Sequence, residues 1–271
     1  MNIEDRGYQF ADGIYEVVHV DRGRFIDADR HLSRLERSLG EVRISMPMGR
    51  TALEQVLHEV VRRNRVRDGL IYMQVTRGVA RRDHAFPARI TGPSLVVTTR
   101  RLPPYPRDVD RWATTAITAP DQRWARCDIK SVALLPNVLA RQAAREQGAY
   151  EAILIGTDGM VTEGAATNVW IVDAGGTLRT RPLDHAILPG CTRSALLSEL
   201  ASHGIPLEER AFSASELVAA SEVFLTSATS FVKPVLQIDG VPVRDGTVGP
   251  VARRLFALFS RHVQGSLQNA A

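Results

Sequence analysis

The chain has 271 residues, a formal net charge of +4 and 44% hydrophobic residues, values typical of a globular protein with enough length for a sizeable core. No apolar run approaches the roughly 20 residues that span a bilayer, and the first residues lack the apolar core of a signal peptide, so we expect no membrane partner. Two cysteines, Cys127 and Cys191, are too few for a disulfide framework or a cysteine metal cluster. We therefore expect a cytoplasmic protein without a metal site.

The positive charge comes almost entirely from arginine. The densest cluster, Arg62-Arg63-Asn64-Arg65-Val66-Arg67, closes a predicted helix, where cations interact favourably with the helix dipole. No aromatic residues alternate with these arginines and no recognition motif follows them, so we expect no nucleic-acid partner.

The first hundred residues mix strand and helix patterns. An Asp-Gly turn leads into the first strand, with Tyr15 near its start, and leucines spaced three and four apart mark the first helix. The predicted elements are strands ending at residue 20 and over 23–26, helices over 30–39 and 51–66, and strands over 70–78 and 94–99. Three prolines within 102–106 exclude a helix or a central strand. We place a linker at residues 104–106, between domains over 1–103 and 107–271.

The second half repeats the mixture in a new order. Strands are predicted near 112–119, 124–130, 150–156, 168–173, 178–180, 222–226 and 235–238, and helices over 136–147, 192–203, 214–219 and 250–263. Helices among aliphatic strands that do not alternate favour an α/β or α+β fold over a β-sandwich.

Lys130 is one of only two lysines in the chain, the other being Lys233. Arginine can replace lysine wherever only a positive charge is needed, but it cannot supply an amine that loses its proton and attacks a carbonyl. Lys130 ends the predicted strand over 124–130. On position alone, a lysine that reaches from a strand end to water is the more ordinary interpretation.

Two further segments could bind a phosphate. Leu188-Pro189-Gly190-Cys191-Thr192-Arg193 runs directly into a predicted helix, whose free N–H groups and Thr192 hydroxyl suit an anion. Thr226-Ser227-Ala228-Thr229-Ser230 is a second cluster of small and hydroxyl side chains after a strand. Helix starts and such turns are common, and Arg34 on the first helix is either a surface cation or a phosphate clamp.

Glu163 and a cationic loop complete the candidate residues. Glu163 lies among small residues beside Gly164, where a flat ring could approach, although a solvated turn glutamate is the ordinary alternative. Arg82 and His84 follow a predicted strand and suit a small molecule that carries a carboxylate.

An amine, a carboxylate, two phosphate-binding turns and a carboxylate trap together describe a pyridoxal-phosphate enzyme. The chain resembles the fold-type IV aminotransferases that use pyridoxal 5'-phosphate (PLP), and among them the D-amino-acid aminotransferases. The runs that carry the resemblance are DRGYQFADGIYEVV (5–18), IYMQVTRG with Arg82-x-His84 (71–84), WARCDIKS (124–131), VLARQAA and GAYEAIL (138–154), VTEG with Asn168, and LPGCTR (188–193).

The resemblance implies a small N-terminal α/β domain, a larger C-terminal domain with a barrel-like sheet, and PLP bound between them. It also implies a homodimer in which each active site borrows loop residues from the partner. Lys130 resembles the Schiff-base lysine, which also moves the substrate Cα proton. Glu163 matches the carboxylate that keeps the pyridine nitrogen protonated, and Asn168 falls in the same cofactor-binding motif.

The remaining roles also come from the resemblance. Arg34, the backbone at Cys191 and Thr192, and the Ser227–Ala228 turn match the phosphate cup. Tyr15, together with Arg82 and His84 from the partner subunit, matches the trap for the α-carboxylate of the substrate. Fixing that carboxylate would select which face of Cα presents its hydrogen, and hence a D-amino acid of the D-alanine or D-glutamate type with a 2-oxo acid such as pyruvate or 2-oxoglutarate.

The sequence departs from the pattern of this family at several positions. Only residues 1–4 precede the DRGYQF run, where a further strand pair is usual. The other departures are Ala228 at a usual threonine, Ala165 and Ala166 at usual serines, Phe231 at a usual acidic residue and Pro189 at a usual lysine. These departures concern the side-chain preference of the enzyme. Three alternatives stay open: a branched-chain L-amino-acid aminotransferase and an aminodeoxychorismate lyase, against both of which the Arg82-x-His84 pair argues, and a non-catalytic arginine-rich protein on this fold.

Overall fold

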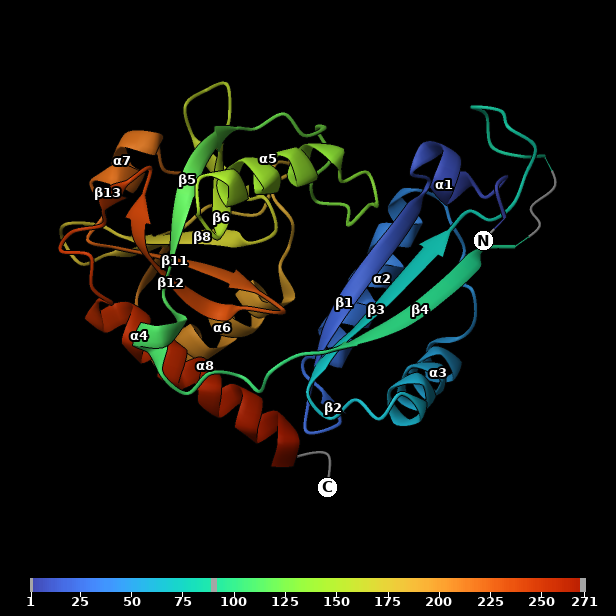
Figure 1. Cartoon of the computed structure of the whole chain (residues 1–271), viewed down its shortest axis with the longest axis horizontal. Helices are drawn as coiled ribbons and strands as arrows, with labels where there is room; N and C mark the ends of the chain where they lie inside the picture. The colour runs from blue at the N-terminus through green and yellow to red at the C-terminus, as the bar shows by residue number, and fades with distance from the viewer. Residues whose placement is uncertain (1, 89–91, 269–271) are drawn as a thin grey trace. The chain divides into compact units, whose positions relative to one another are not determined.

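Two compact units make up the computed structural model in Figure 1, which describes residues 2–88 and 92–268. One unit is Met1–Tyr105 with Ile129–Leu134, and the other is Pro106–Asp128 with Leu135–Ala271. The division after Tyr105 falls within the proline-rich segment. The predicted boundaries place Lys130 in the second domain, whereas its short segment, Ile129–Leu134, belongs to the first unit.

Backbone hydrogen bonds explain why this segment belongs to the first unit. The N–H of Tyr15 donates to the carbonyl of Lys130 at 3.0 Å, and the N–H of Val132 donates to the carbonyl of Gly13 at 3.0 Å. Ser131 forms an antiparallel bridge with Ile14 between them. The lysine segment is therefore fixed along the start of the first strand.

The first unit is an antiparallel four-stranded sheet in the order β2-β1-β3-β4 with three helices. Its strands are β1 (Gly13–Asp21), β2 (Arg24–Phe25), β3 (Gly69–Thr76) and β4 (Ser94–Arg101), and its helices are α1 (Arg6–Phe10), α2 (Ala28–Glu41) and α3 (Arg50–Arg63). The register pairs Ile14 with Val75 and Val18 with Ile71, so these apolar side chains share one face of the sheet.

That apolar face is covered by α2 and α3. The leucine stripe of α2 and the apolar face of α3 join the strand residues in one core, of Leu32, Leu35, Leu39, Leu53, Leu57, Val61, Ile14, Val18, Ile71, Met73 and Val75. Burying each such side chain contributes about 1.5–3 kcal/mol. The predicted helices and strands of the first hundred residues are thus confirmed in kind.

The second unit is a mixed, curled sheet in the order β10-β9-β8-β11-β12-β5-β6-β7, with β13 paired to β12 (Figure 1). Its strands are β5 (Thr114–Pro120), β6 (Glu151–Ile155), β7 (Val161–Gly164), β8 (Asn168–Val172), β9 (Leu178–Thr180), β10 (Leu207–Glu209), β11 (Glu222–Ser227), β12 (Phe231–Ile238) and β13 (Val241–Pro242). Its helices are α4 (Val109–Trp112), α5 (Leu135–Glu146), α6 (Cys191–Ser202), α7 (Ala214–Val218) and α8 (Pro250–Gln268). The predicted mixed α/β fold with a barrel-like larger domain is confirmed.

Helices cover the curled sheet at two places. Helices α6 and α8 pack on β11 and β12 and against each other, and α5 packs on β5 and β6. Trp170 is fully buried, stacks on Phe224 at 5.6 Å between ring centres, and donates its indole N–H to the Thr226 hydroxyl at 3.0 Å. Within the described residues, no helix is both long and apolar enough to cross a membrane.

The predicted strand over 124–130 is wrong. These residues form turns, and Cys127, Asp128 and Ile129 are buried in succession rather than alternately. Two of the alternating polar residues, Arg126 and Asp128, form a local ion pair at 2.9 Å and do not line one face of a strand. The N–H of Cys127 donates to the carbonyl of His185 at 2.8 Å, which anchors the turn without a neighbouring strand.

Candidate functional site

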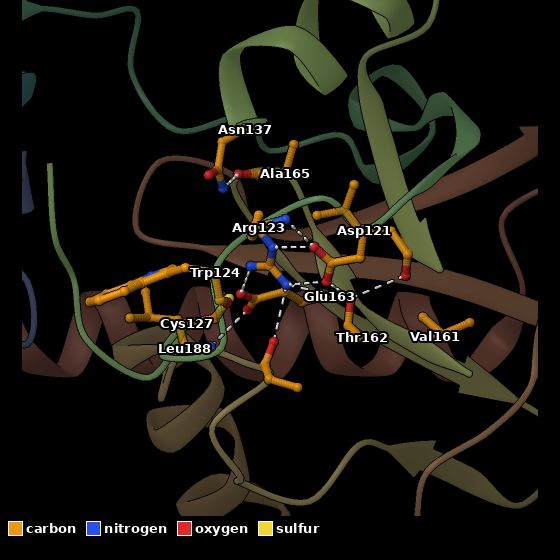
Figure 2. A network of polar contacts seen from close by, with 12 residues as sticks. Asp121, Arg123, Trp124, Cys127, Asn137, Val161, Thr162, Glu163, Ala165 and Leu188 are labelled. Carbon is orange, nitrogen blue, oxygen red and sulfur yellow. Dashed lines mark hydrogen bonds and ion pairs between the residues drawn. The ribbon is translucent and has the colours of Figure 1, made fainter. Parts of the chain in front are cut away.

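Glu163 lies in β7 as a buried carboxylate, not as a solvated turn residue, and is only 5% exposed. One oxygen, Oε2, accepts from Asn168 Nδ2 at 2.9 Å and from the N–H of Leu188 at 3.0 Å. The other oxygen, Oε1, is bound by Arg123 Nη1 (Figure 2). Three donors therefore fix the orientation of this carboxylate.

Arg123 is held in turn by a second carboxylate, that of Asp121. Its Nε donates to Asp121 Oδ1 at 2.9 Å and its Nη2 donates to Oδ2 at 2.8 Å, while the Thr162 hydroxyl donates to Oδ2 at 2.7 Å (Figure 2). Burial works against both charges. The ion pairs nevertheless raise the pKa of Arg123 and lower that of Asp121, so the guanidinium reaches Glu163 from a fixed position.

Cys127 lies beside this network and is a poor nucleophile. Burial, offset only in part by Arg123, raises the pKa of its thiol to about 11. Its Sγ donates to the carbonyl of Trp124 at 3.1 Å. Because the thiolate is the reactive form, cysteine chemistry at this position is disfavoured near neutral pH.

The start of α6 adjoins the Glu163 network through Asn168. Gly190 is the N-cap of α6, and a Cβ at this position would collide with Asn168 Oδ1. Cys191 and Thr192 form the buried first turn of the helix. The N-cap glycine has no side chain that could bind the first turn of this twelve-residue helix, and N–H groups at a helix start suit an anion.

The second hydroxyl cluster forms a tight turn between β11 and β12. The N–H of Ser230 donates to Ser227 Oγ at 3.1 Å, and the two serine hydroxyls lie 2.6 Å apart. Trp112 Nε1 donates to the carbonyl of Ser230 at 2.9 Å. Ala228 lies within this turn, where its methyl group offers no side-chain hydrogen bond.

In the first unit, Lys130 and Tyr15 lie together. The Lys130 ammonium is 4.2 Å from the centre of the Tyr15 ring, and the backbone N–H of Lys130 donates to the Ser38 hydroxyl at 3.4 Å. The structure therefore places the predicted amine next to one predicted substrate-binding residue. Lys233, by contrast, is buried in the second unit, where its amine donates to the carbonyl of Trp112 at 2.8 Å.

Arg34 is not a surface cation, the first of the two interpretations that its sequence position allowed. It is 8% exposed, and its Nε and Nη2 donate to the two oxygens of Glu16 at 2.7 and 2.8 Å. His31 Nδ1 lies 2.8 Å from Glu16 Oε2. Burial alone would raise the pKa of Glu16, but Arg34 and His31 hold it at about 2. Its role as a phosphate ligand stays a prediction.

Arg82 and His84 are brought together on the exposed loop after β3. The Arg82 guanidinium lies 5.0 Å from the centre of the Phe10 ring, and the His84 ring lies 5.4 Å from it. Both side chains therefore meet the same aromatic residue at the end of α1.

Sequence reasoning missed Arg123 and its partner Asp121. The only signal was an Asp-x-Arg pair just before the WARCDIK run, in a chain where arginine is common. Within the described residues, no group of three or more His, Cys, Asp or Glu side chains could hold a metal ion.

Comparisons with known proteins show the family of the chain. The family model described as amino-transferase class IV matches residues 13–238. The chain is 42% identical over 270 residues to a D-alanine aminotransferase of Bacillus licheniformis, covering 100% of this chain and 91% of that protein. It is 40% identical over 266 residues to a D-alanine aminotransferase of Listeria monocytogenes, covering 97% and 91%. The branched-chain amino acid aminotransferase of Escherichia coli shares the fold, with a TM-score of 0.86 at 22% identity over 97% of this chain and 89% of that one.

Proposed function

Because the chain belongs to the class IV aminotransferases, which are PLP-dependent enzymes, we propose that it transfers an amino group between a D-amino acid and a 2-oxo acid. The donor would be of the D-alanine or D-glutamate type, and the acceptor would be pyruvate or 2-oxoglutarate. The observation that carries the proposal is the identity of 42% and 40%, over nearly the whole chain, to proteins named D-alanine aminotransferase.

The chemistry of the candidate residues fits PLP. The cofactor supplies an electron sink for the negative charge that develops at the substrate Cα. A buried carboxylate suits its pyridine nitrogen, and Glu163 is such a group, oriented by Arg123 and Asn168. The start of α6, whose N-cap is a glycine, and the Ser227–Ser230 turn offer N–H and hydroxyl donors to a phosphate.

Lys130 is the proposed catalytic residue. Its primary amine would hold the cofactor covalently and would then move the Cα proton once the substrate amine has replaced it. The Tyr15 ring, 4.2 Å from the amine, would limit the directions from which the amine can act. Glu163 would keep a proton on the pyridine nitrogen throughout.

The proposed phosphate contacts come from the backbone of Cys191 and Thr192, from Ser227 and the backbone of Ala228, and from Arg34. The first four lie at the α6 start or in the β11–β12 turn. Arg34 also binds both oxygens of Glu16, and this ion pair fixes the direction of its guanidinium group.

The proposed substrate contacts are Tyr15, Arg82 and His84, which would bind the α-carboxylate. We further propose a cytoplasmic homodimer in which Arg82 and His84 serve the active site of the partner. The exposed position of their loop, which leaves both side chains available to another molecule, supports the shared active site. The two free cysteines support a cytoplasmic location.

A panel of D- and L-amino acids with pyruvate and 2-oxoglutarate tests the reaction directly. We expect turnover of D-alanine and little turnover of L-alanine or of branched-chain L-amino acids. Preferential use of L-valine or L-leucine would favour the branched-chain alternative, and release of pyruvate from aminodeoxychorismate would favour the lyase. A protein that shows no visible absorbance band after PLP is added would be the non-catalytic alternative.

Subunit exchange tests the shared active site. Neither a Lys130→Ala homodimer nor an Arg82→Ala homodimer should be fully active. Mixed dimers should regain activity, because one site would combine Lys130 of one chain with Arg82 of the other. Mixed dimers with no more activity than the Arg82→Ala parent would place the loop in the site of its own chain.

A further inference from the structure

One buried arginine, Arg6 in α1, holds the backbone of the loop that carries Arg82 and His84. Its Nη1 donates to the carbonyls of Asp83 at 2.6 Å and Ala85 at 3.2 Å, and its Nη2 donates to the carbonyl of His84 at 3.3 Å. Arg6 is only 3% exposed, although the loop residues that it binds are exposed. A single rigid guanidinium thus fixes three successive peptide groups.

Asp12 anchors this arginine and a second one. It accepts from Arg6 Nε at 2.8 Å, and from Arg77 Nε at 2.7 Å and Arg77 Nη2 at 2.9 Å. Arg77 then reaches the same loop, because its guanidinium lies 3.7 Å from the centre of the Phe86 ring. Burial opposes the Asp12 charge, yet the two arginines lower the pKa of this carboxyl. Asp12 therefore stays ionised and binds both cations.

The loop side chains are oriented from the same helix. Phe10, at the end of α1, contacts both the Arg82 guanidinium and the His84 ring. Since α1 is a single short helix, Arg6 and Phe10 move as one body. The backbone and the side chains of the loop thus share one support.

We propose that Arg6, anchored by Asp12, is a positioning residue that presets the loop of Arg82 and His84 to receive the substrate carboxylate. This inference rests on the proposed function, which gives Arg82 and His84 their role. An exposed loop that is ordered only on substrate binding loses affinity to the ordering of its backbone. Three carbonyl contacts from a buried guanidinium order the loop beforehand, so the effect falls on substrate binding and not on cofactor chemistry.

Arg6→Lys is the test variant, because an ammonium keeps the charge but cannot reach three carbonyls and Asp12 together. Loss of one hydrogen bond to a charged group corresponds to at least about a tenfold change. We expect KM for D-alanine to rise about tenfold, kcat and the bound-cofactor absorbance to change little, and the Ala85 amide to exchange hydrogen faster. The single-turnover rate with a primary amine that lacks a carboxylate should stay the same. Arg81→Gln, an exposed substitution in the same loop, should change none of these quantities.

The outcomes separate this inference from the proposed function. An unchanged KM in Arg6→Lys, in an enzyme where Arg82→Ala raises KM, would overturn the inference alone. An equal loss of rate with the carboxylate-free amine would also overturn it, since it would indicate a general structural defect. If Arg6→Lys does not fold, Asp12→Asn carries the same test, with a smaller rise in KM expected. A protein without a cofactor band or D-alanine turnover would instead refute the proposed function.

Discussion

Arg123 donates to the Glu163 carboxylate through Nη1, while Asp121 binds its Nε and Nη2. The guanidinium therefore cannot turn away from Glu163 without breaking a bidentate ion pair. The carboxylate proposed to act on the cofactor is thus held by a residue that does not itself need to touch the cofactor.

Glu163→Gln should retain the cofactor but lower kcat by a larger factor than it changes KM. A neutral amide cannot keep a proton on the pyridine nitrogen, and this interaction matters most in the transition state. Steady-state kinetics with D-alanine, together with the absorbance spectrum, measure both effects. An unchanged kcat would remove Glu163 from the catalytic machinery.

Arg123→Gln should destabilise the protein by about 3–5 kcal/mol, because the substitution leaves the buried Asp121 and Glu163 carboxylates without their common partner. The Arg123 side chain is 6% exposed, so water cannot fully replace it. Urea unfolding at pH 7 measures the loss, and Arg111→Gln, at an exposed arginine of the same unit, is the matched control. Equal free energies of unfolding for the two variants would show that the Arg123 network contributes little to stability.

Borohydride reduction of the holoenzyme should attach the cofactor to the peptide that contains Lys130. Lys233 is the only competing lysine, and burial together with Arg141 lowers its pKa to about 8, so a lowered pKa alone does not identify the reactive amine. Lys130→Arg should abolish turnover, since a guanidinium stays protonated. Peptide mapping that finds the label on Lys233 would contradict the assignment.

The stability of the first unit should fall in acid through Glu16. Its pKa is about 2 in the folded protein and 4.5 in the ordinary side chain, so the unfolded chain binds more protons between these values. The contribution is complete above pH 4.5 and is lost as the pH falls towards 2. The difference between the two pKa values, 4.5 minus about 2, corresponds to roughly 3 kcal/mol in the free energy of unfolding. In Glu16→Gln, unfolding free energies at pH 5, 4 and 3 should vary less than in the unaltered protein; an equal slope would contradict this origin.

The sequence was informative where local pattern decides structure and uninformative where distant residues meet. Leucine spacing located α2, and the Pro189-Gly190 step located the start of α6. The pairing of Arg34 with Glu16 joins a helix to a strand 18 residues away, and neither local pattern predicts it. Arg123 was missed for the same reason, because only the folded chain brings Asp121 and Glu163 to it.

The alternating pattern before Lys130 also gives a wrong prediction, that of a strand over 124–130. Trp124, Arg126 and Asp128 alternate with smaller residues as a strand would, yet Arg126 and Asp128 pair with each other across a turn. The backbone of Lys130 is fixed by Tyr15 and Ser38. The rarity of lysine and the surrounding motif therefore identify Lys130 as a candidate residue, but they do not predict its local structure.

Arg82→Ala should reduce kcat/KM for D-alanine by about ten- to a hundredfold. Arginine grips a carboxylate through two parallel N–H donors, and a hydrogen bond to a charged group contributes about 1.5–3 kcal/mol, which converts at 1.36 kcal/mol for each tenfold change. His84→Ala should lose less, because a single donor disappears and water can partly replace it. The cofactor absorbance should survive both changes, since neither residue is assigned to the ring or the phosphate.

Arg81→Ala is the matched control for Arg82, because it removes the same charge from the neighbouring position of the exposed loop. Arg82 contacts the Phe10 ring and so has a defined direction, and the loss should therefore depend on position and not on net charge alone. Damage by Arg81→Ala equal to that of Arg82→Ala would mean that the loop acts only through its charge. Full D-alanine activity in Arg82→Ala would mean that the substrate carboxylate binds elsewhere, and the branched-chain alternative would then gain support.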